Sequence, residues 1–117
     1  MASTKTRKSQ SSADERRSDR RYRIQAQLEY KLFRRRRVIA TGRGQTVNVS
    51  STGILFESDQ PLPEGCDIEL SIMWPVHLND TAGLKLCVTG RIVRAQDNCI
   101  AVRAGQHEFR TWRIDKV

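Results

Sequence analysis

Long apolar runs, paired cysteines and aromatic residues are scarce in this chain of 117 residues. No stretch is apolar enough to span a membrane, and no apolar segment follows residues 1–8 as it would in a signal peptide. We therefore expect a cytoplasmic protein. Cys66, Cys87 and Cys99 are odd in number and form no C-x-x-C pair, which argues against a disulfide framework or a Cys-rich zinc site. We expect all three to be buried, reduced thiols.

Signatures of catalysis are also missing. The two histidines, His77 and His107, have no metal-ligand spacing to each other or to an acidic residue, so we expect both at the surface. There is no G-x-S-x-G motif, no glycine-rich phosphate loop and no carboxylate pair suited to acid and base roles. The sequence thus predicts neither an enzyme nor a metal or cofactor site.

The charge is strongly asymmetric. Residues 1–47 hold 14 Lys and Arg against 4 Asp and Glu, a net +10, whereas residues 48–117 hold 7 against 9, a net −2. The formal charge of +8 therefore belongs to the first part of the chain. This asymmetry predicts an anionic partner for that part, which could be a nucleic acid, a nucleotide, a membrane surface or a protein.

The length is sufficient for one domain, and the patterns within it are those of short strands. Residues 1–15 lack periodicity and predict a disordered basic tail, followed by an arginine segment over residues 15–23. From residue 22 to 32, apolar and polar residues alternate without a break, with Tyr30 facing inward. Arg34 to Arg37 predict a hairpin connection or a solvated strand end, and Gly42 and Gly44 a bulge or bend.

The remaining strands are expected at close spacing. After a second strand that ends at Asn48, they cover residues 54–57, 67–74, 84–93 and 99–104, with a polar loop over residues 75–83. Phe109 and Trp112, three residues apart, suggest a helical turn within residues 105–114. The predicted fold is all-β: a small six-stranded antiparallel β-barrel at residues 16–104, with a disordered tail at 1–15 and a helical turn or tail at 105–117.

A polar corner separates two of these strands. Asn48, Ser50 and Gly53 form the pattern [Asp or Asn]-x-Ser-x-x-Gly, flanked by the apolar alternation of Val47 and Val49 before it and of Ile54 and Phe56 after it. An amide, a hydroxyl and a glycine that allows close approach suit the edge of a flat polar ring. The alternative is a hairpin whose Asn and Ser cap their own backbone.

The arginine segment offers a second recognition element. Arg17 and Arg21 stand in an R-x-x-x-R arrangement immediately before the first strand. Guanidinium groups form bidentate hydrogen bonds with phosphate, bind the O6 and N7 edge of guanine with two hydrogen bonds, and stack on purines. The alternative is a solvated basic linker.

Together, the arginine pair before the first strand and the Asn and Ser corner between strands two and three resemble the PilZ domain family, from about Arg16 to Ala104. In that family the two motifs bind cyclic di-GMP, a bacterial second messenger. The resemblance implies that Arg17 and Arg21 hold phosphate and the guanine Hoogsteen edge. It also implies that Asn48 and Ser50 contact a guanine, with Gly53 leaving room for it.

The resemblance predicts a cyclic di-GMP receptor or adaptor that changes its surface on binding and so signals to an effector protein. Arg16 is a further candidate ligand-binding residue, because it could allow two stacked nucleotides to bind where otherwise one would. The main alternative is a small basic β-barrel that binds RNA or DNA through Arg34 to Arg37 and the tail, which the shortage of exposed aromatics disfavours. A structural module that has lost the ligand is a third possibility.

Overall fold

The computed structural model describes residues 22–113, which form six strands and no helix. The strands are β2 (Gln27–Arg34), β3 (Arg37–Val49), β4 (Gly53–Ser58), β5 (Asp67–Asn79), β6 (Ala82–Gln96) and β7 (Cys99–Arg113). All strand pairs are antiparallel. The predicted all-β class with six antiparallel strands is confirmed, whereas the predicted disordered tail lies outside the described residues.

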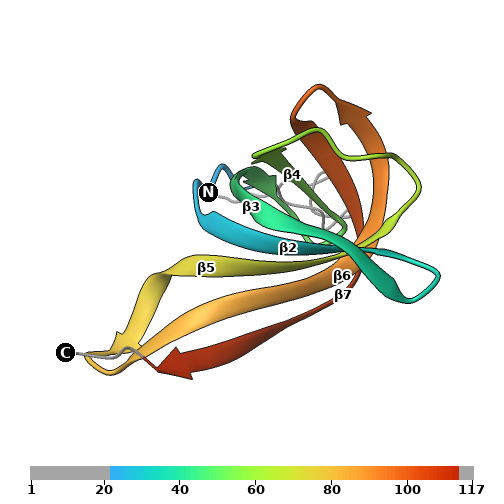
Figure 1. Ribbon diagram of the computed structural model, residues 1–117. Coiled ribbons are helices and arrows are strands. Elements are labelled where there is room, and N and C mark those ends of the chain that lie inside the picture. The colour runs from blue at the N-terminus through green and yellow to red at the C-terminus, as the bar shows by residue number, and fades with distance from the viewer. Residues whose placement is uncertain (1–21, 114–117) are drawn as a thin grey trace, which may run out of the picture.

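The six strands close into one ring in the order β2-β3-β4-β7-β6-β5, a closed barrel (Figure 1). Two pairings between strands distant in sequence complete it, β2 with β5 and β4 with β7. The alternation of the first strand is confirmed, because Leu28, Tyr30 and Leu32 are each only 2% exposed. They pack with the inward residues of the other strands, among them Phe56, Ile72 and Ile100.

Gly42 and Gly44 do not mark the bend that the sequence suggested. The β-bulges flanking β3 fall instead near Leu32/Phe33 and Thr46/Asn48. The two glycines make room for large inward side chains: a Cβ on Gly42 would lie 2.3 Å from the Tyr30 hydroxyl, and one on Gly44 would lie 2.9 Å from Phe56 Cδ2 and 2.4 Å from the Glu57 carbonyl oxygen. A side chain at either position would therefore displace the core or a neighbouring strand.

The four-arginine stretch is the hairpin connection between β2 and β3, as predicted. Arg35 and Arg36 occupy the turn in the left-handed region, with φ of 53° and 67°. All four side chains, Arg34 to Arg37, are exposed.

Strands β5, β6 and β7 continue beyond the ring as a three-stranded extension, visible at the lower left of Figure 1. We call residues 73–79, 82–89 and 106–113 the arm. The predicted polar loop over residues 75–83 is wrong, because β5 runs to Asn79 and β6 starts at Ala82. Pro75 misled the prediction; it is tolerated because β5 pairs with β2 only as far as Ile72, so one edge of β5 is free there.

The helical turn predicted within residues 105–114 is also wrong, because β7 continues as a strand to Arg113. The pairing that overrides the helical spacing is a regular ladder with β6, from Thr89↔Gln106 to Ala82↔Arg113. Phe109 and Trp112 consequently lie on opposite faces. Phe109 packs edge-on against Trp74, with ring centroids 5.3 Å apart, and Trp112 covers Gly83.

The cysteines differ from one another in exposure. Cys66 is buried as predicted, Cys87 is half-buried, and Cys99 is exposed, which corrects the prediction of three buried thiols. All three are free thiols. Cys99 is exposed because it begins β7 beside the turn that follows Gln96, where its side chain faces out of the ring.

Candidate functional site

The orientation of Asn48 depends on a β-bulge in β3. Thr46 pairs with Phe56 and Asn48 with Leu55, so Val47 is an extra residue in the ladder. Thr46 and Val49 are both buried, at 1% and 5% exposure, although residues three positions apart on a regular strand face opposite sides. Without the bulge, strict alternation from Thr46 would direct Asn48 into the core. The bulge leaves Asn48 half-buried on the outer side and Val47 exposed, so the apolar alternation of Val47 and Val49 does not place both side chains in the core.

The corner between β3 and β4 is organised by Ser50. Its Oγ accepts hydrogen bonds from the backbone N–H of Gly53, at 3.0 Å, and of Thr52, at 3.3 Å, and donates to the Gly53 carbonyl at 3.1 Å. A backbone bond from Ser50 N to the same carbonyl, at 2.9 Å, closes the turn. Ser50 therefore caps its own hairpin, as one of the two sequence interpretations proposed.

Strand β7 supports the corner from the other side. Gly53 pairs with Arg103, and the Ala104 N–H donates to the Thr52 carbonyl at 2.9 Å. A Cβ on Gly53 would come within 3.2 Å of the Val102 carbonyl oxygen. Close approach of two strands, and not a positive φ, is thus the role of this glycine; Gly65, with φ of 87°, is the glycine of the left-handed region in residues 22–113.

The start of the described chain is attached directly beside this corner. Tyr22 and Val49 exchange two backbone hydrogen bonds, of 2.8 and 2.9 Å, as an isolated antiparallel bridge. Further along, Thr46 N donates to the Ala26 carbonyl at 2.9 Å, and the Thr46 hydroxyl accepts from Ala26 N at 2.9 Å and donates to the Ile24 carbonyl. Residues 22–26 therefore lie along the end of β3.

A shallow depression of about 510 Å³ lies between this attached segment and the bulge, lined by Arg23, Gln25, Val47 and Asn48. Its polar groups are a guanidinium and two carboxamides, which can donate to phosphate oxygens and pair with the edge of a nucleobase. Arg103, exposed on β7 opposite Gly53, adds a second guanidinium near the corner.

Of the predicted site residues, Asn48, Ser50 and Gly53 lie together at the β3–β4 corner. Arg16, Arg17 and Arg21 lie outside the described residues. Sequence reasoning missed Arg23 and Arg103 as neighbours of the corner. Alternation alone places Arg103 on an outward face, but only the pairing of β4 with β7 brings it opposite Gly53.

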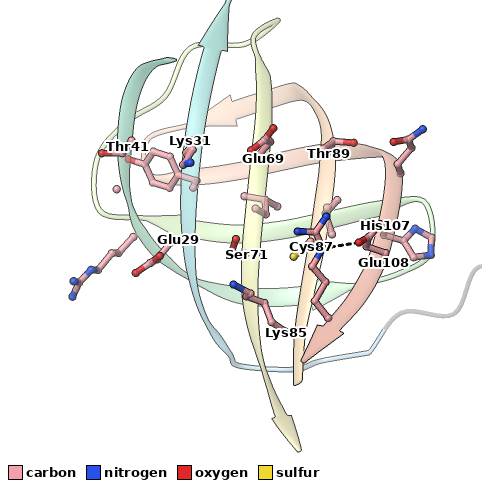
Figure 2. A pocket seen from close by; sticks show the side chains of 17 residues that line it. Glu29, Lys31, Thr41, Glu69, Ser71, Lys85, Cys87, Thr89, His107 and Glu108 are labelled. Carbon is pink, nitrogen blue, oxygen red and sulfur yellow. Dashed lines mark hydrogen bonds and ion pairs between the residues drawn. The ribbon is translucent and has the colours of Figure 1, made fainter. Parts of the chain in front are cut away.

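A larger depression, of about 630 Å³, lies on the outer face of the sheet formed by β3, β2, β5, β6 and β7. Figure 2 shows Glu29, Lys31, Glu69, Lys85 and Glu108 along it. Acidic and basic side chains alternate here, so this depression has no marked preference for an anion. It is therefore a poorer candidate for an anionic nucleotide than the corner.

His77 and His107 are both exposed, as predicted. Within residues 22–113, no three His, Cys, Asp or Glu side chains gather closely enough to hold a metal ion. The same part of the chain contains no helix long and apolar enough to cross a membrane.

Comparisons with known proteins identify the family. The model of the PilZ domain matches residues 15–109, which covers most of the chain and includes both sequence motifs. A comparison with curated proteins and one with solved structures found no match. The matched range joins the arginine segment, the β3–β4 corner and the ring that supports it, and this chain therefore belongs to the PilZ domain family, whose members are cyclic di-GMP receptors.

Proposed function

We propose that this protein is a bacterial, cytoplasmic receptor that binds cyclic di-GMP between its arginine segment and the β3–β4 corner. The observation that carries the proposal is the Tyr22–Val49 bridge. Arg21 directly precedes Tyr22 in the chain, and Asn48 and Ser50 flank Val49, so the hydrogen bonds between Tyr22 and Val49 support a site shared by the two motifs. Two segments distant in sequence thereby contribute to one binding site.

Each candidate residue has a chemical role in this proposal. Arg17 and Arg21 bind phosphate and the Hoogsteen edge of guanine, as R-x-x-x-R does in the family. Asn48 forms hydrogen bonds to a guanine with its side-chain amide, which the bulge directs outward. Gly53 keeps the corner close to β7, so that the base has room. Ser50 acts chiefly by holding the turn, since its hydroxyl already has three backbone partners.

Signalling in this proposal is a change of surface. The arginine segment closes over the nucleotide, because charge-assisted hydrogen bonds to the ligand offset the entropy of fixing the segment. The closed segment presents a new surface to an effector protein, as ordering transitions do in other receptors. No catalytic step is part of the proposal.

Arg16 extends the proposal to stoichiometry. Two stacked cyclic di-GMP molecules bring four phosphates together, and one arginine pair cannot offset their repulsion. A third guanidinium could bridge phosphates and cover an outer purine. The alternative is a solvated Arg16 and a single bound nucleotide.

Calorimetric titration with cyclic di-GMP tests the proposal, beside GTP and a single-stranded RNA, at low and at moderate salt. We expect saturable binding of the dinucleotide with a shallow salt dependence, since a ligand with two phosphates releases few counterions. A nucleic-acid binder would instead lose orders of magnitude in affinity between the two salt concentrations. Absence of heat with the dinucleotide at high micromolar concentration would exclude the receptor function.

A further inference from the structure

The arm has two free edges among the described residues. Strand β5 pairs with β2 only up to Ile72, and β7 pairs with β4 only up to Arg103, whereas β6 lies between them along the whole arm. Residues 73–79 of β5 and 106–113 of β7 are thus edge strands. Long edge strands present unpaired backbone groups that other strands can pair with.

The two edges differ in how they are protected. Residues 73–79 contain Pro75, and their register with β6 is interrupted twice, between Trp74 and His77 and between His77 and Asn79. Proline and irregular register are the usual devices that prevent edge pairing. Residues 106–113 of β7 contain no proline and keep an unbroken register with β6. The β7 edge is therefore the one suited to accept another strand.

We propose that two copies of this chain pair edge to edge through residues 106–112 of β7, in an antiparallel arrangement centred on Phe109. Among centres at residues 108, 109 and 110, the charges along the strand favour Phe109. In a two-fold antiparallel pair, opposite residues face the same side of the sheet, so the axis must pass through a residue and its own copy. Centring on Glu108 or Arg110 would oppose like charges, which is destabilising.

Centring on Phe109 instead places Glu108 opposite Arg110 of the second copy, and Arg110 opposite Glu108. Within one chain these two side chains already form an ion pair, with Arg110 Nε 2.6 Å from Glu108 Oε2, at the depression of Figure 2. Their side chains are 60% and 63% exposed, so both are available to a second strand. The edge is thus complementary in charge to itself, which is the property that an isologous interface requires.

The side chain of Phe109, on the opposite face of the arm from Glu108 and Arg110, also favours a two-fold axis at Phe109. Phe109 is 51% exposed and contacts Trp74 edge-on, so much of its ring faces solvent. In the pair, Phe109 lies directly opposite its own copy, where aromatic cross-strand pairs are stabilising. The three-stranded arm then becomes a continuous six-stranded sheet.

A seven-residue edge buries little area, so we expect a weak dimer that forms with rising protein concentration. Sedimentation velocity from low to high micromolar concentration measures this equilibrium. Glu108→Arg alone and Arg110→Glu alone each oppose like charges at two symmetric positions, and each should raise the dimer dissociation constant about tenfold or more. A mixture of the two variants should form heterodimers, because each supplies the charge that the other needs.

Cross-linking tests the register itself. His107 and Thr111 are exposed and lie opposite each other across the proposed axis, so their Cα atoms should be about 4.5 to 5.5 Å apart, within disulfide range. In a Cys99→Ser background, which removes the exposed native thiol, His107→Cys/Thr111→Cys should form disulfide-linked dimers on mild oxidation. Each single variant is the matched control, because its two copies lie four residues apart along the strands and cannot be bridged.

The outcomes separate the possible occupants of this edge. Two results together would establish that a second copy of the chain occupies the β7 edge. The mixed charge variants form heterodimers, and cross-links appear in the double cysteine variant but in neither single variant. A monomer at all concentrations overturns the proposal. If removal of residues 1–15 then produces the dimer, this chain's own N-terminal part covers the edge; if it does not, the edge serves a different protein. Neither result depends on cyclic di-GMP, so failure here leaves the receptor proposal intact.

Discussion

At the scale of single residues, the most connected polar group in the core is the Tyr30 hydroxyl. It donates to Asp59 Oδ1 at 2.8 Å and accepts from Gln60 Nε2 at 3.0 Å. Arg43 N donates to the second carboxylate oxygen of Asp59 at 3.2 Å. The hydrogen bond from Tyr30 and then that from Arg43 lower the pKa of Asp59, while burial raises the pKa of Tyr30. The network joins β2 and β3 to the segment that follows β4.

Tyr30→Phe should lower the free energy of unfolding by about 1 to 2 kcal/mol at neutral pH, because Gln60 and Asp59 lose a partner. The pKa of Asp59 should rise toward its usual value, measurable by carboxyl NMR titration. Since the folded-state pKa is the lower one, the stabilisation is present above the unfolded pKa of about 3.9 and is lost as the pH falls through the folded value. The variant should therefore lose less stability on acidification. Tyr22→Phe, at an exposed tyrosine, should change neither quantity.

Two site variants should weaken nucleotide binding by different amounts. Arg21→Ala removes charge-assisted hydrogen bonds and should cost about 2 to 4 kcal/mol of binding free energy. Ser50→Ala should cost about 0.5 to 1.5 kcal/mol of binding and, because its hydroxyl caps the turn, about 1 kcal/mol of stability. Ser51→Ala, at the exposed neighbour, is the control for calorimetry and thermal unfolding. Equal small losses of affinity for Arg21→Ala and Ser50→Ala would argue against the receptor function.

At the scale of elements, Thr46 attaches the N-terminal segment to β3. Its buried hydroxyl bonds Ala26 N and the Ile24 carbonyl, so Thr46→Val leaves a buried N–H without a partner. We expect a loss of about 1 to 3 kcal/mol in stability, faster amide exchange at Ala26, and weaker nucleotide binding. Thr41→Val, at an exposed threonine of the same strand, should have little effect. Unchanged exchange at Ala26 would show that other contacts hold the segment.

Sequence alternation predicted the elements well where a strand is paired on both sides and less well elsewhere. It placed Leu28, Tyr30 and Leu32 inside correctly, because a one-residue slip there would expose the core. It failed at Val47, since a bulge shifts the period by one residue and leaves no mark in the residue types. It also failed beyond Trp74 and beyond Ala104, where the arm forms through pairing between strands that no local pattern reveals.

The candidate site was predictable only in part. The polar types of Asn48 and Ser50 and the turn chemistry around Gly53 are local signals. The bridge from Tyr22 to Val49 and the position of Arg103 opposite Gly53 are contacts between distant segments, which depend on closure of the ring. The outward direction of Asn48 likewise depends on the bulge.

At the scale of the whole molecule, the number of bound nucleotides tests the proposed role of Arg16. We expect a calorimetric stoichiometry near two cyclic di-GMP per chain, falling to one in Arg16→Leu with residual affinity retained. Arg35→Leu, which removes an equal charge at the β2–β3 hairpin, controls for the general electrostatic effect and should leave the stoichiometry unchanged. A stoichiometry of one in the unmodified protein would refute the role of Arg16 alone.

The arm and the corner should act independently, because they lie on different parts of the sheet. Glu108→Arg should therefore leave the affinity for cyclic di-GMP within about twofold of the unmodified protein, while it disrupts pairing at β7. Calorimetry at a concentration where both proteins are monomers makes the comparison. A large change in affinity would mean that pairing at β7 and nucleotide binding are coupled.

Closure of the ring determines when the β3–β4 corner can form during protein synthesis. The motif residues leave the ribosome early, but Gly53 and Thr52 gain their support from Val102, Arg103 and Ala104 of the last strand. Until β7 pairs with β4, the corner has no neighbour on that side. A nascent chain can therefore display both sequence motifs before the corner is complete, and the proposed nucleotide site can form only after β7 has been synthesised and has paired with β4.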